Sequence, residues 1–305
     1  MTAEAAGGAG RLHLVDGTFE LFRAHFSKRP GHRAPSGQEA KATVGLAGSL
    51  LALLSDEREA VTHLAVAFDN PIRSFRNDLF PGYKTEEGVP VELLAQFDAA
   101  EEAARALGVT VWSMREHEAD DALATGAARF RDQVGQVRIL SPDKDLGQCL
   151  SGRQVVQVDR IRGREIDEGA LLDRRGIRPE SVPDWLALVG DDADGLPGLP
   201  GFGEKTASAL LGRYVHLEAI PAEPAAWPGA IRGADKLARS LQEGREAVSL
   251  YRRLATLVRD VPLRESLDDL RWRGAPRDRF EAWCQSVGAT TLLAAGSAGR
   301  VRWAP

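Results

Sequence analysis

A short apolar run that ends close to an acidic residue occurs four times in the first half of this 305-residue chain. Each run has the length and composition of a buried β-strand, and helical patterns lie between the runs. Strands that alternate with helices predict an α/β fold with a parallel sheet covered on both faces. The four predicted strands, each with the acidic residues that follow it, are 12–15 with Asp16, 63–68 with Asp69, 109–112 with Glu118, Asp120 and Asp121, and 137–140 with Asp143 and Asp145.

The carboxyl ends of parallel strands form the edge of a sheet at which ligands bind. We therefore expect the acidic residues to converge there on one small volume. The densest group is residues 118–121, with three carboxylates in four residues, and such crowding costs free energy unless a cation lies between them. On an isolated helix this group would be interpreted as solvated surface. Its repetition after every predicted strand favours a metal site.

The predicted ligands include no histidine or cysteine. Hard oxygen ligands favour Mg²⁺ or Mn²⁺ over zinc. There are more carboxylates than one ion needs, which suggests two ions, the arrangement used for in-line displacement at phosphorus.

The composition is that of a globular protein with a substantial core, at 43% hydrophobic residues. Cys149 and Cys284 lie far apart and have no partner at metal-ligand spacing, so neither a disulfide framework nor a zinc site is predicted. No apolar run approaches the roughly 18 residues of a membrane span, and residues 1–10 have the character of a disordered tail rather than an export signal. A cytoplasmic location is expected. The net charge of −5 gives no overall attraction to nucleic acid, but local basic patches can coexist with an acidic site.

A second informative segment, residues 190–207, contains five glycines and two prolines. This composition excludes a continuous helix, whereas the pattern of residues 204–211 predicts one. A glycine-rich turn that opens a helix exposes backbone N–H groups, which can bind a phosphate. An ordinary tight turn between two helices explains the glycines equally well. Earlier in the chain, Ser36 and Glu39 have the spacing of a capping box and predict a helix that ends near Leu54.

Six motifs in order make the chain similar to the bacterial 5′-3′ exonuclease family, from about residue 11 to about residue 260. This family includes the N-terminal nuclease domain of DNA polymerase I, phage 5′ nucleases and, more distantly, the flap endonucleases, and the chain resembles the stand-alone form. The motifs are Val-Asp-Gly, Phe-Asp, Phe-Arg-x-x-Leu-Phe-Pro-x-Tyr-Lys, Glu-Ala-Asp-Asp, Asp-Lys-Asp-Leu and Gly-Asp-x-x-Asp-x-x-Pro-Gly-x-x-Gly-x-Gly-Glu-Lys-Thr-Ala.

The resemblance implies a fold and a division into parts. Residues 11–180 are expected to form a PIN-like, or resolvase-like, nuclease core with a parallel sheet and a helical arch around residues 77–105. Residues 181–262 are expected to form an all-helical, SAM-like subdomain with a helix-3-turn-helix that grips duplex DNA. Residues 263–305 would be a C-terminal extension that packs on the core.

The resemblance also implies an activity and its residues. The family hydrolyses DNA phosphodiesters as a 5′-3′ exonuclease and 5′ flap endonuclease, leaving a 5′-phosphate and a 3′-hydroxyl. Arg76 and Lys84 match basic residues that contact the reacting phosphate, and Tyr83 matches an aromatic residue on which a base can stack. The first ion would be surrounded by Asp16, Asp69, Glu118, Asp120 and Asp121, and the second by Asp143, Asp145, Asp191 and Asp194. The duplex-binding turn, often with a bound K⁺, matches Gly198, Gly201, Gly203, Lys205 and Thr206.

The partners implied are DNA with a 5′ end or flap next to a duplex, RNA–DNA primer junctions, and a functional link to a DNA polymerase at the nucleoid. The sequence departs from the family between Thr85 and Ala104, where six acidic residues and no basic ones replace a basic arch. Acidic residues repel a phosphate backbone, which predicts weak threading of a flap. Ala193 and Gly195 also replace the usual Ser and Asn. Two alternatives stay open, a structure-specific DNA-binding protein with weak catalysis and a ribonuclease that uses the same acidic site.

Overall fold

The structure is a computed structural model that describes residues 10–229, 231–297 and 301–305, so the expected tail falls, except for Gly10, outside the described residues. Its strands are β1 (Arg11–Asp16), β2 (His63–Asp69), β3 (Thr110–Met114), β4 (Gln136–Leu140), β5 (Val155–Asp159) and β6 (Arg164–Ile166). They form one sheet in the order β3-β2-β1-β4-β5-β6. Strands β1 to β4, which correspond to the four predicted strands, are parallel as predicted; β5 adds a further parallel strand, and β6 joins the edge antiparallel to β5.

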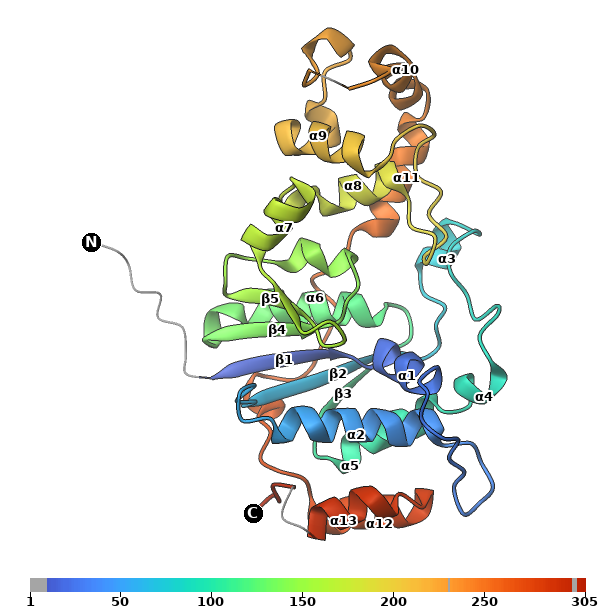
Figure 1. The fold of residues 1–305 in the computed structure, drawn as a ribbon, viewed down its shortest axis with the longest axis vertical. Helices are drawn as coiled ribbons and strands as arrows, with labels where there is room; N and C mark the ends of the chain where they lie inside the picture. The colour runs from blue at the N-terminus through green and yellow to red at the C-terminus, as the bar shows by residue number, and fades with distance from the viewer. Residues whose placement is uncertain (1–9, 230, 298–300) are drawn as a thin grey trace, which may run out of the picture.

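Thirteen α-helices surround and extend this sheet in the described part of the chain. Figure 1 shows three levels, with the sheet and its helices in the middle, helices α7 to α11 above it, and α12 and α13 below it. The helices are α1 (Gly17–His25), α2 (Lys41–Ser55), α3 (Arg76–Leu79), α4 (Val91–Leu94), α5 (Phe97–Ala106), α6 (Ala119–Phe130), α7 (Glu168–Arg175), α8 (Val182–Val189), α9 (Glu204–Tyr214), α10 (Ala234–Glu243), α11 (Arg245–Ala255), α12 (Arg277–Val287) and α13 (Thr290–Ser297).

Alternating side chains of the strands build a separate core on each face of the sheet. Leu14 of β1 packs with Leu123 and other residues of α6 on one face, whereas Val15 packs with Leu50 of α2 and the helix α5 on the other. All three of these leucines and Val15 are fully buried. Burial of one such side chain contributes about 1.5–3 kcal/mol, so the two-sided packing fixes both the sheet and the position of its carboxyl edge.

Acidic residues at that edge also determine where two helices begin. The Asp16 side chain accepts a hydrogen bond from the N–H of Phe19 at 2.8 Å and so caps α1. Glu118 is the N-cap of α6, where its N–H donates to Asp121 Oδ2 at 3.0 Å. The residues that were predicted as metal ligands are thus held by helix capping as well.

The start of α2 differs from the prediction. Helix α2 begins at Lys41, with no capping box from Ser36, and the Oε1 of Gln96 instead accepts hydrogen bonds from the N–H groups of Ala42 and Thr43, at 3.0 and 3.2 Å. Residues 97–106, expected in an arch, form α5, which packs against α2 in the core. Of the expected arch, the shorter stretch 80–96 therefore lies outside α5.

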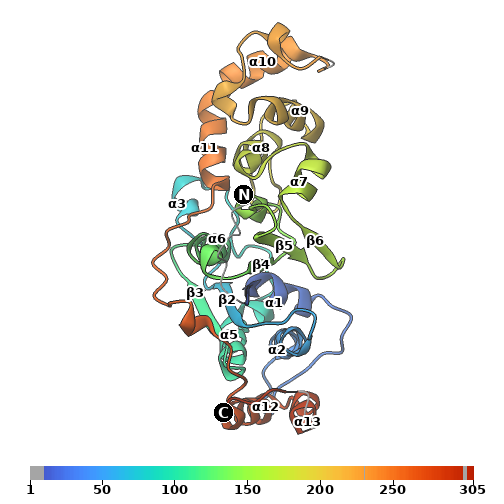
Figure 2. The same cartoon turned by 90° about the vertical axis from the view of Figure 1, so that its left-hand side faces the viewer.

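The C-terminal half has a core of its own, in which Trp185 of α8, Leu210 of α9 and Leu254 of α11 are buried. Figure 2 shows α8, α9 and α11 gathered above the sheet. Residues after α11 return to the sheet, and Phe280 and Trp283 of α12 join the core on the α5 side. No helix among the described residues combines the length and apolar character needed to cross a bilayer.

Candidate active site

An open cleft of about 450 Å³ lies at the carboxyl edge of the sheet. The ends of β1 and β2, the start of α6 and the segment after β4 each bring a carboxylate to it. The convergence predicted from the four strand ends is therefore observed. The predicted residues that line the cleft are Asp16, Asp69, Lys84, Asp120 and Asp143.

Burial and mutual repulsion perturb these carboxylates. Burial, reinforced by the charges of Asp69 and Asp143, raises the pKa of Asp16 to about 7. Burial, reinforced by Glu118, raises the pKa of Asp69 to about 6. The pKa of Asp120 is raised well above its ordinary value by burial and by the charges of Asp143 and Asp16. In the absence of a cation the site favours protonated carboxyls, so a cation bound among them would relieve the repulsion.

A second group of carboxylates lies next to the cleft. Asp145 follows β4, and Asp191 and Asp194 follow α8, and these three side chains offer ligand oxygens within 4.8 Å of one another. The Oδ1 atoms of Asp120 and Asp145 are buried without a hydrogen-bond partner among the described residues. Buried oxygens of this kind, surrounded by other carboxylates, fit a hard divalent cation.

Glu118 connects the predicted basic and aromatic residues. Its Oε2 lies 2.9 Å from Lys84 Nζ and accepts a hydrogen bond from the Tyr83 hydroxyl at 3.2 Å, while its Oε1 accepts one from Ser74 Oγ at 2.6 Å. Lys84 Nζ also lies 2.9 Å from Asp194 Oδ1, and the Lys84 side chain is 25% exposed. Tyr83 is only 4% exposed and packs in the C-terminal core. Its ring therefore supports Glu118 and is not open for base stacking in this conformation.

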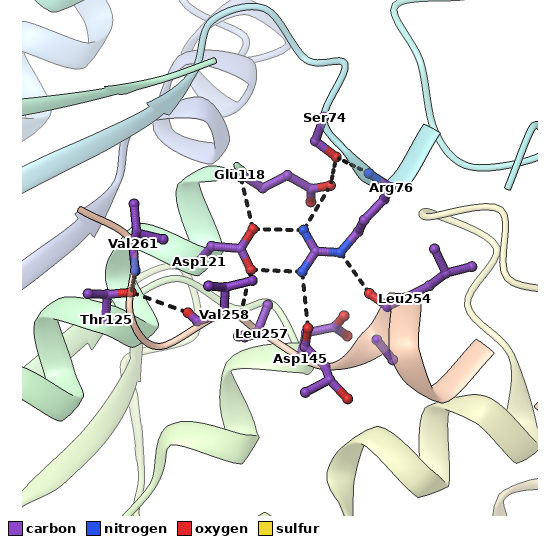
Figure 3. A network of polar contacts seen from close by, with 12 residues as sticks. Ser74, Arg76, Glu118, Asp121, Thr125, Asp145, Leu254, Leu257, Val258 and Val261 are labelled. Carbon is purple, nitrogen blue, oxygen red and sulfur yellow. Dashed lines mark hydrogen bonds and ion pairs between the residues drawn. The ribbon is translucent and has the colours of Figure 1, made fainter. Parts of the chain in front are cut away.

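Arg76 and Asp121 form a buried ion pair behind the cleft (Figure 3). Two guanidinium nitrogens donate to the two Asp121 oxygens, both at 2.7 Å, and Arg76 Nε donates to the Leu254 carbonyl at 2.7 Å. Asp121 accepts two further bonds, from the N–H groups of Glu118 and Val258. The side chains of Arg76 and Asp121 are 1% and 0% exposed. These contacts differ from the expectation for both residues, because they leave Asp121 no free oxygen for a metal and turn Arg76 away from the cleft.

The glycine-rich turn divides into buried and exposed positions. Gly198 is buried with φ +68°, and a Cβ there would come within 2.6 Å of the backbone of α8, so this glycine allows a close approach between segments. Gly201, Gly203 and Lys205 are exposed, and Thr206 is half-buried in the first turn of α9. The first N–H groups of a helix have no partner within the helix. The exposed half of the turn can therefore receive an anion.

Two serines that the sequence analysis did not single out also contact the site. Ser141 Oγ donates to Asp16 Oδ2 at 2.9 Å and accepts from the N–H of Asp143, and Ser74 holds Glu118 as described above. Ser141 lies directly after β4 and two residues before Asp143. Its place at the end of a predicted strand could have indicated that it lies at the site. Asp192, by contrast, is exposed, although it lies between two of the predicted ligands.

Comparison with known families agrees with this architecture. Residues 11–176 match the N-terminal resolvase-like domain of 5′-3′ exonucleases, and residues 177–278 match their C-terminal SAM fold. The chain belongs to the 5′-3′ exonuclease family. As a member of this family it is a nuclease, that is, a hydrolase of phosphodiester bonds, and the predicted family and fold class are confirmed.

Relatives and solved structures agree with this assignment. DNA polymerase I of Bacillus caldotenax is 33% identical over 287 residues, which are 93% of this chain and 32% of that protein. DNA polymerase I of Mycobacterium leprae is 34% identical over 88% of this chain and 29% of its own length. The chain thus spans about a third of these relatives.

Among solved structures, a zinc-bound T5 5′-exonuclease has a TM-score of 0.63 at 20% identity, covering 80% of this chain and 89% of that one. The catalytic core of Rad2 in complex with a DNA substrate has a TM-score of 0.56 at 13% identity, covering 94% and 89%. At these identities the likeness concerns the fold.

Proposed function

We propose that this family member is a divalent-metal-dependent 5′-3′ exonuclease and 5′ flap endonuclease that cleaves DNA to a 5′-phosphate and a 3′-hydroxyl with two ions. The observation that carries the proposal is the convergence of carboxylates from separate strand ends on one cleft that Lys84 also lines. Acidic clefts without such basic groups would repel a phosphodiester.

We assign the carboxylates to two cation positions. One position would be held by Asp16, Asp69, Asp120 and Asp143 of the cleft, with Glu118 beside them. The other would be held by Asp145, Asp191 and Asp194. All are oxygen ligands, so we propose Mg²⁺ with Mn²⁺ as a substitute. The chemistry that such ions supply is a nucleophile at neutral pH and neutralisation of charge on the scissile phosphate.

The chain's own groups would bind and orient the DNA. Lys84 is the cation nearest the cleft and can pair with the scissile phosphate once its present partners, Glu118 and Asp194, are neutralised. Exposed N–H groups around Gly201 and Gly203, with Lys205, would bind a phosphate of the duplex, and carbonyls of the turn could hold a K⁺ ion. Such contacts position DNA without reading its sequence.

The proposed substrate is DNA with a 5′ end or a flap beside a duplex, including RNA–DNA primer junctions, processed at the nucleoid together with a DNA polymerase. The segment 80–96 is short and is anchored in the core by Leu93, and it carries Glu86, Glu87 and Glu92. Because these charges repel a single strand, we expect recessed or nicked 5′ ends to be cleaved better than long flaps.

The test is cleavage of 5′-labelled and 3′-labelled flap, nicked and single-stranded DNA with Mg²⁺, Mn²⁺ or EDTA. We expect metal-dependent cutting at the 5′ end or junction, a loss of at least 100-fold in Asp120→Asn, and unchanged activity in Asp192→Asn, an exposed aspartate of the same acidic region. Duplex binding without cutting in either metal would overturn the nuclease proposal in favour of a DNA-binding protein. Cutting of RNA alone would favour the ribonuclease.

A further inference from the structure

Arg175, the last residue of α7, holds its guanidinium over an indole ring. The guanidinium carbon lies 4.6 Å from the centroid of the Trp185 ring. Trp185 is 2% exposed, and its Nε1–H donates to Ser208 Oγ of α9 at 3.1 Å. The ring is therefore fixed between α8 and α9, and it fixes one face of the Arg175 side chain by a cation–π contact.

The donors of this guanidinium are unused. Arg175 is half-buried, yet its side chain has no hydrogen bond and no ion pair among the described residues, and its guanidinium contacts the Trp185 ring. A guanidinium carries five N–H donors in a planar fork. The Arg175 nitrogens are not among the buried polar atoms without a partner, so these donors reach solvent and are open to a ligand. The other half-buried arginines among the described residues have a carboxylate or carbonyl partner, as Arg105 does with Glu101.

The charges that act on Arg175 come from the acidic site and from the first residue of α9. Burial lowers the pKa of Arg175, and the charges of Glu204, Asp145, Asp143 and Asp191 act in the opposite direction, in that order of strength. Glu204 is the first residue of α9, directly after the glycine turn, and the other three belong to the proposed metal site. The carbonyl of Gly176, the next residue, packs closely on Gly212 of α9. The end of α7 that carries Arg175 is thus held against α9, which begins directly after the glycine turn.

We propose that Arg175 binds a backbone phosphate of the duplex on the path between the scissile bond and the turn at residues 198–203. This inference rests on the proposed function. A phosphate accepts two parallel N–H bonds from the guanidinium fork, while the indole face keeps the fork oriented.

The test is the salt dependence of binding to a 5′-flap duplex in EDTA, measured by fluorescence anisotropy between 50 and 200 mM salt, for the full chain and three variants. We expect Arg175→Gln to weaken binding and to reduce the slope of log K against log salt by about 0.9, the value for one phosphate contact. Arg175→Lys keeps the charge and should restore the slope with part of the affinity. Arg153→Gln removes an exposed arginine just before β5, at the amino ends of the parallel strands, and should leave the slope unchanged.

Each result separates a DNA contact from a structural role. An unchanged slope in Arg175→Gln, with or without a lowered Tm, would overturn the inference and leave only stacking on Trp185. An equal drop in Arg153→Gln would overturn it too, because the effect would then be one of net charge. If the unaltered protein does not bind the duplex at all, the proposed function fails first.

Discussion

Replacing Asp121 with asparagine tests whether this residue binds metal or holds the site together. In the structure its two oxygens accept both Arg76 nitrogens at 2.7 Å, and the N–H groups of Glu118 and Val258 at 3.0 and 2.9 Å. Asparagine has nearly the same shape, but it carries no charge and replaces one acceptor by a donor. The change would leave the Arg76 guanidinium charged, buried and facing an N–H₂ group.

The expected cost follows from burial. Removing one partner of a buried ion pair typically destabilises a protein by about 3–5 kcal/mol, and here Glu118, whose Oε1 lies 3.3 Å from Arg76 Nη1, would compensate the remaining charge in part, which favours the lower end of that range. Both side chains here are almost completely buried, so solvent cannot compensate the charge. We expect the free energy of unfolding of Asp121→Asn to fall by about that amount.

The neighbouring residue supplies the control. Asp120 Oδ1 has no hydrogen-bond partner among residues 10–229, 231–297 and 301–305, and its pKa is raised by burial and by Asp143 and Asp16. Asp120→Asn removes a repelled charge and should leave the metal-free protein as stable or slightly more stable. It should, however, reduce the stabilisation by Mg²⁺, which for a fully retained site amounts to about 2.7 kcal/mol at 100 times Kd.

The assay is urea unfolding of both variants in EDTA and in Mg²⁺, followed by circular dichroism. Asp121→Asn should be less stable than the unaltered protein in both conditions but should still be stabilised by Mg²⁺. Asp120→Asn should keep its stability in EDTA and lose the stabilisation by Mg²⁺. The reasoning is refuted if Asp121→Asn stays within about 1 kcal/mol of the unaltered protein in EDTA and loses the Mg²⁺ increment. Asp121 would then be a metal ligand, as the resemblance implied.

Three further predictions follow from single contacts. The pKa values of Asp16 and Asp69 are raised to about 7 and about 6, so folding favours their protonated forms. The Tm in EDTA should therefore fall between pH 5 and pH 8, and Mg²⁺ should raise the Tm more at pH 8. Equal Mg²⁺ shifts at both pH values would contradict this. Gly195 has φ +73°, and a Cβ there would lie 2.2 Å from the Gly82 carbonyl oxygen. Gly195→Ala should therefore lower the free energy of unfolding by about 1–3 kcal/mol in urea and lower flap and nick cleavage. Full stability would show that the segments around Gly82 and Gly195 separate freely. Gln96→Ala should lower the free energy of unfolding by about 1–3 kcal/mol, because it leaves the buried start of α2 uncapped. Gln96→Glu keeps the acceptor oxygen and should recover most of this loss in the same assay.

The strands and their acidic ends could be predicted because their signals are local. Contiguous apolar runs specify strands that are buried on both faces, and a residue placed just after such a strand has to lie at the carboxyl edge. Asp16, Asp69 and Asp143 line the cleft for that reason. Strand β6 has no such run, since two of its three side chains are exposed, and it was not predicted.

The roles of Arg76, Tyr83 and Gln96 could not be predicted because their partners lie far away in the sequence. Arg76 contacts Asp121 across 45 positions and the Leu254 carbonyl across 178, and Gln96 caps a helix by accepting from Ala42, 54 positions earlier. A motif places such a residue near a site, but only packing decides which way its side chain turns. The pairing with Asp121 therefore became visible only in the structure.

The two halves of the chain complete one site together. Asp191 and Asp194 come from the segment after α8, whereas Asp145 comes from the sheet, so the second group of carboxylates exists only when both halves are docked. The docking contacts lie at the site itself: the N–H of Lys84 donates to the Asp194 carbonyl at 3.1 Å, and Arg76 donates to the Leu254 carbonyl at the end of α11. Because α11 and the segment after α8 share a core with the duplex-binding turn, a displacement of that turn would also move ligands of the metal site. Under the proposed function, duplex binding at the turn would therefore be linked mechanically to the alignment of the carboxylates.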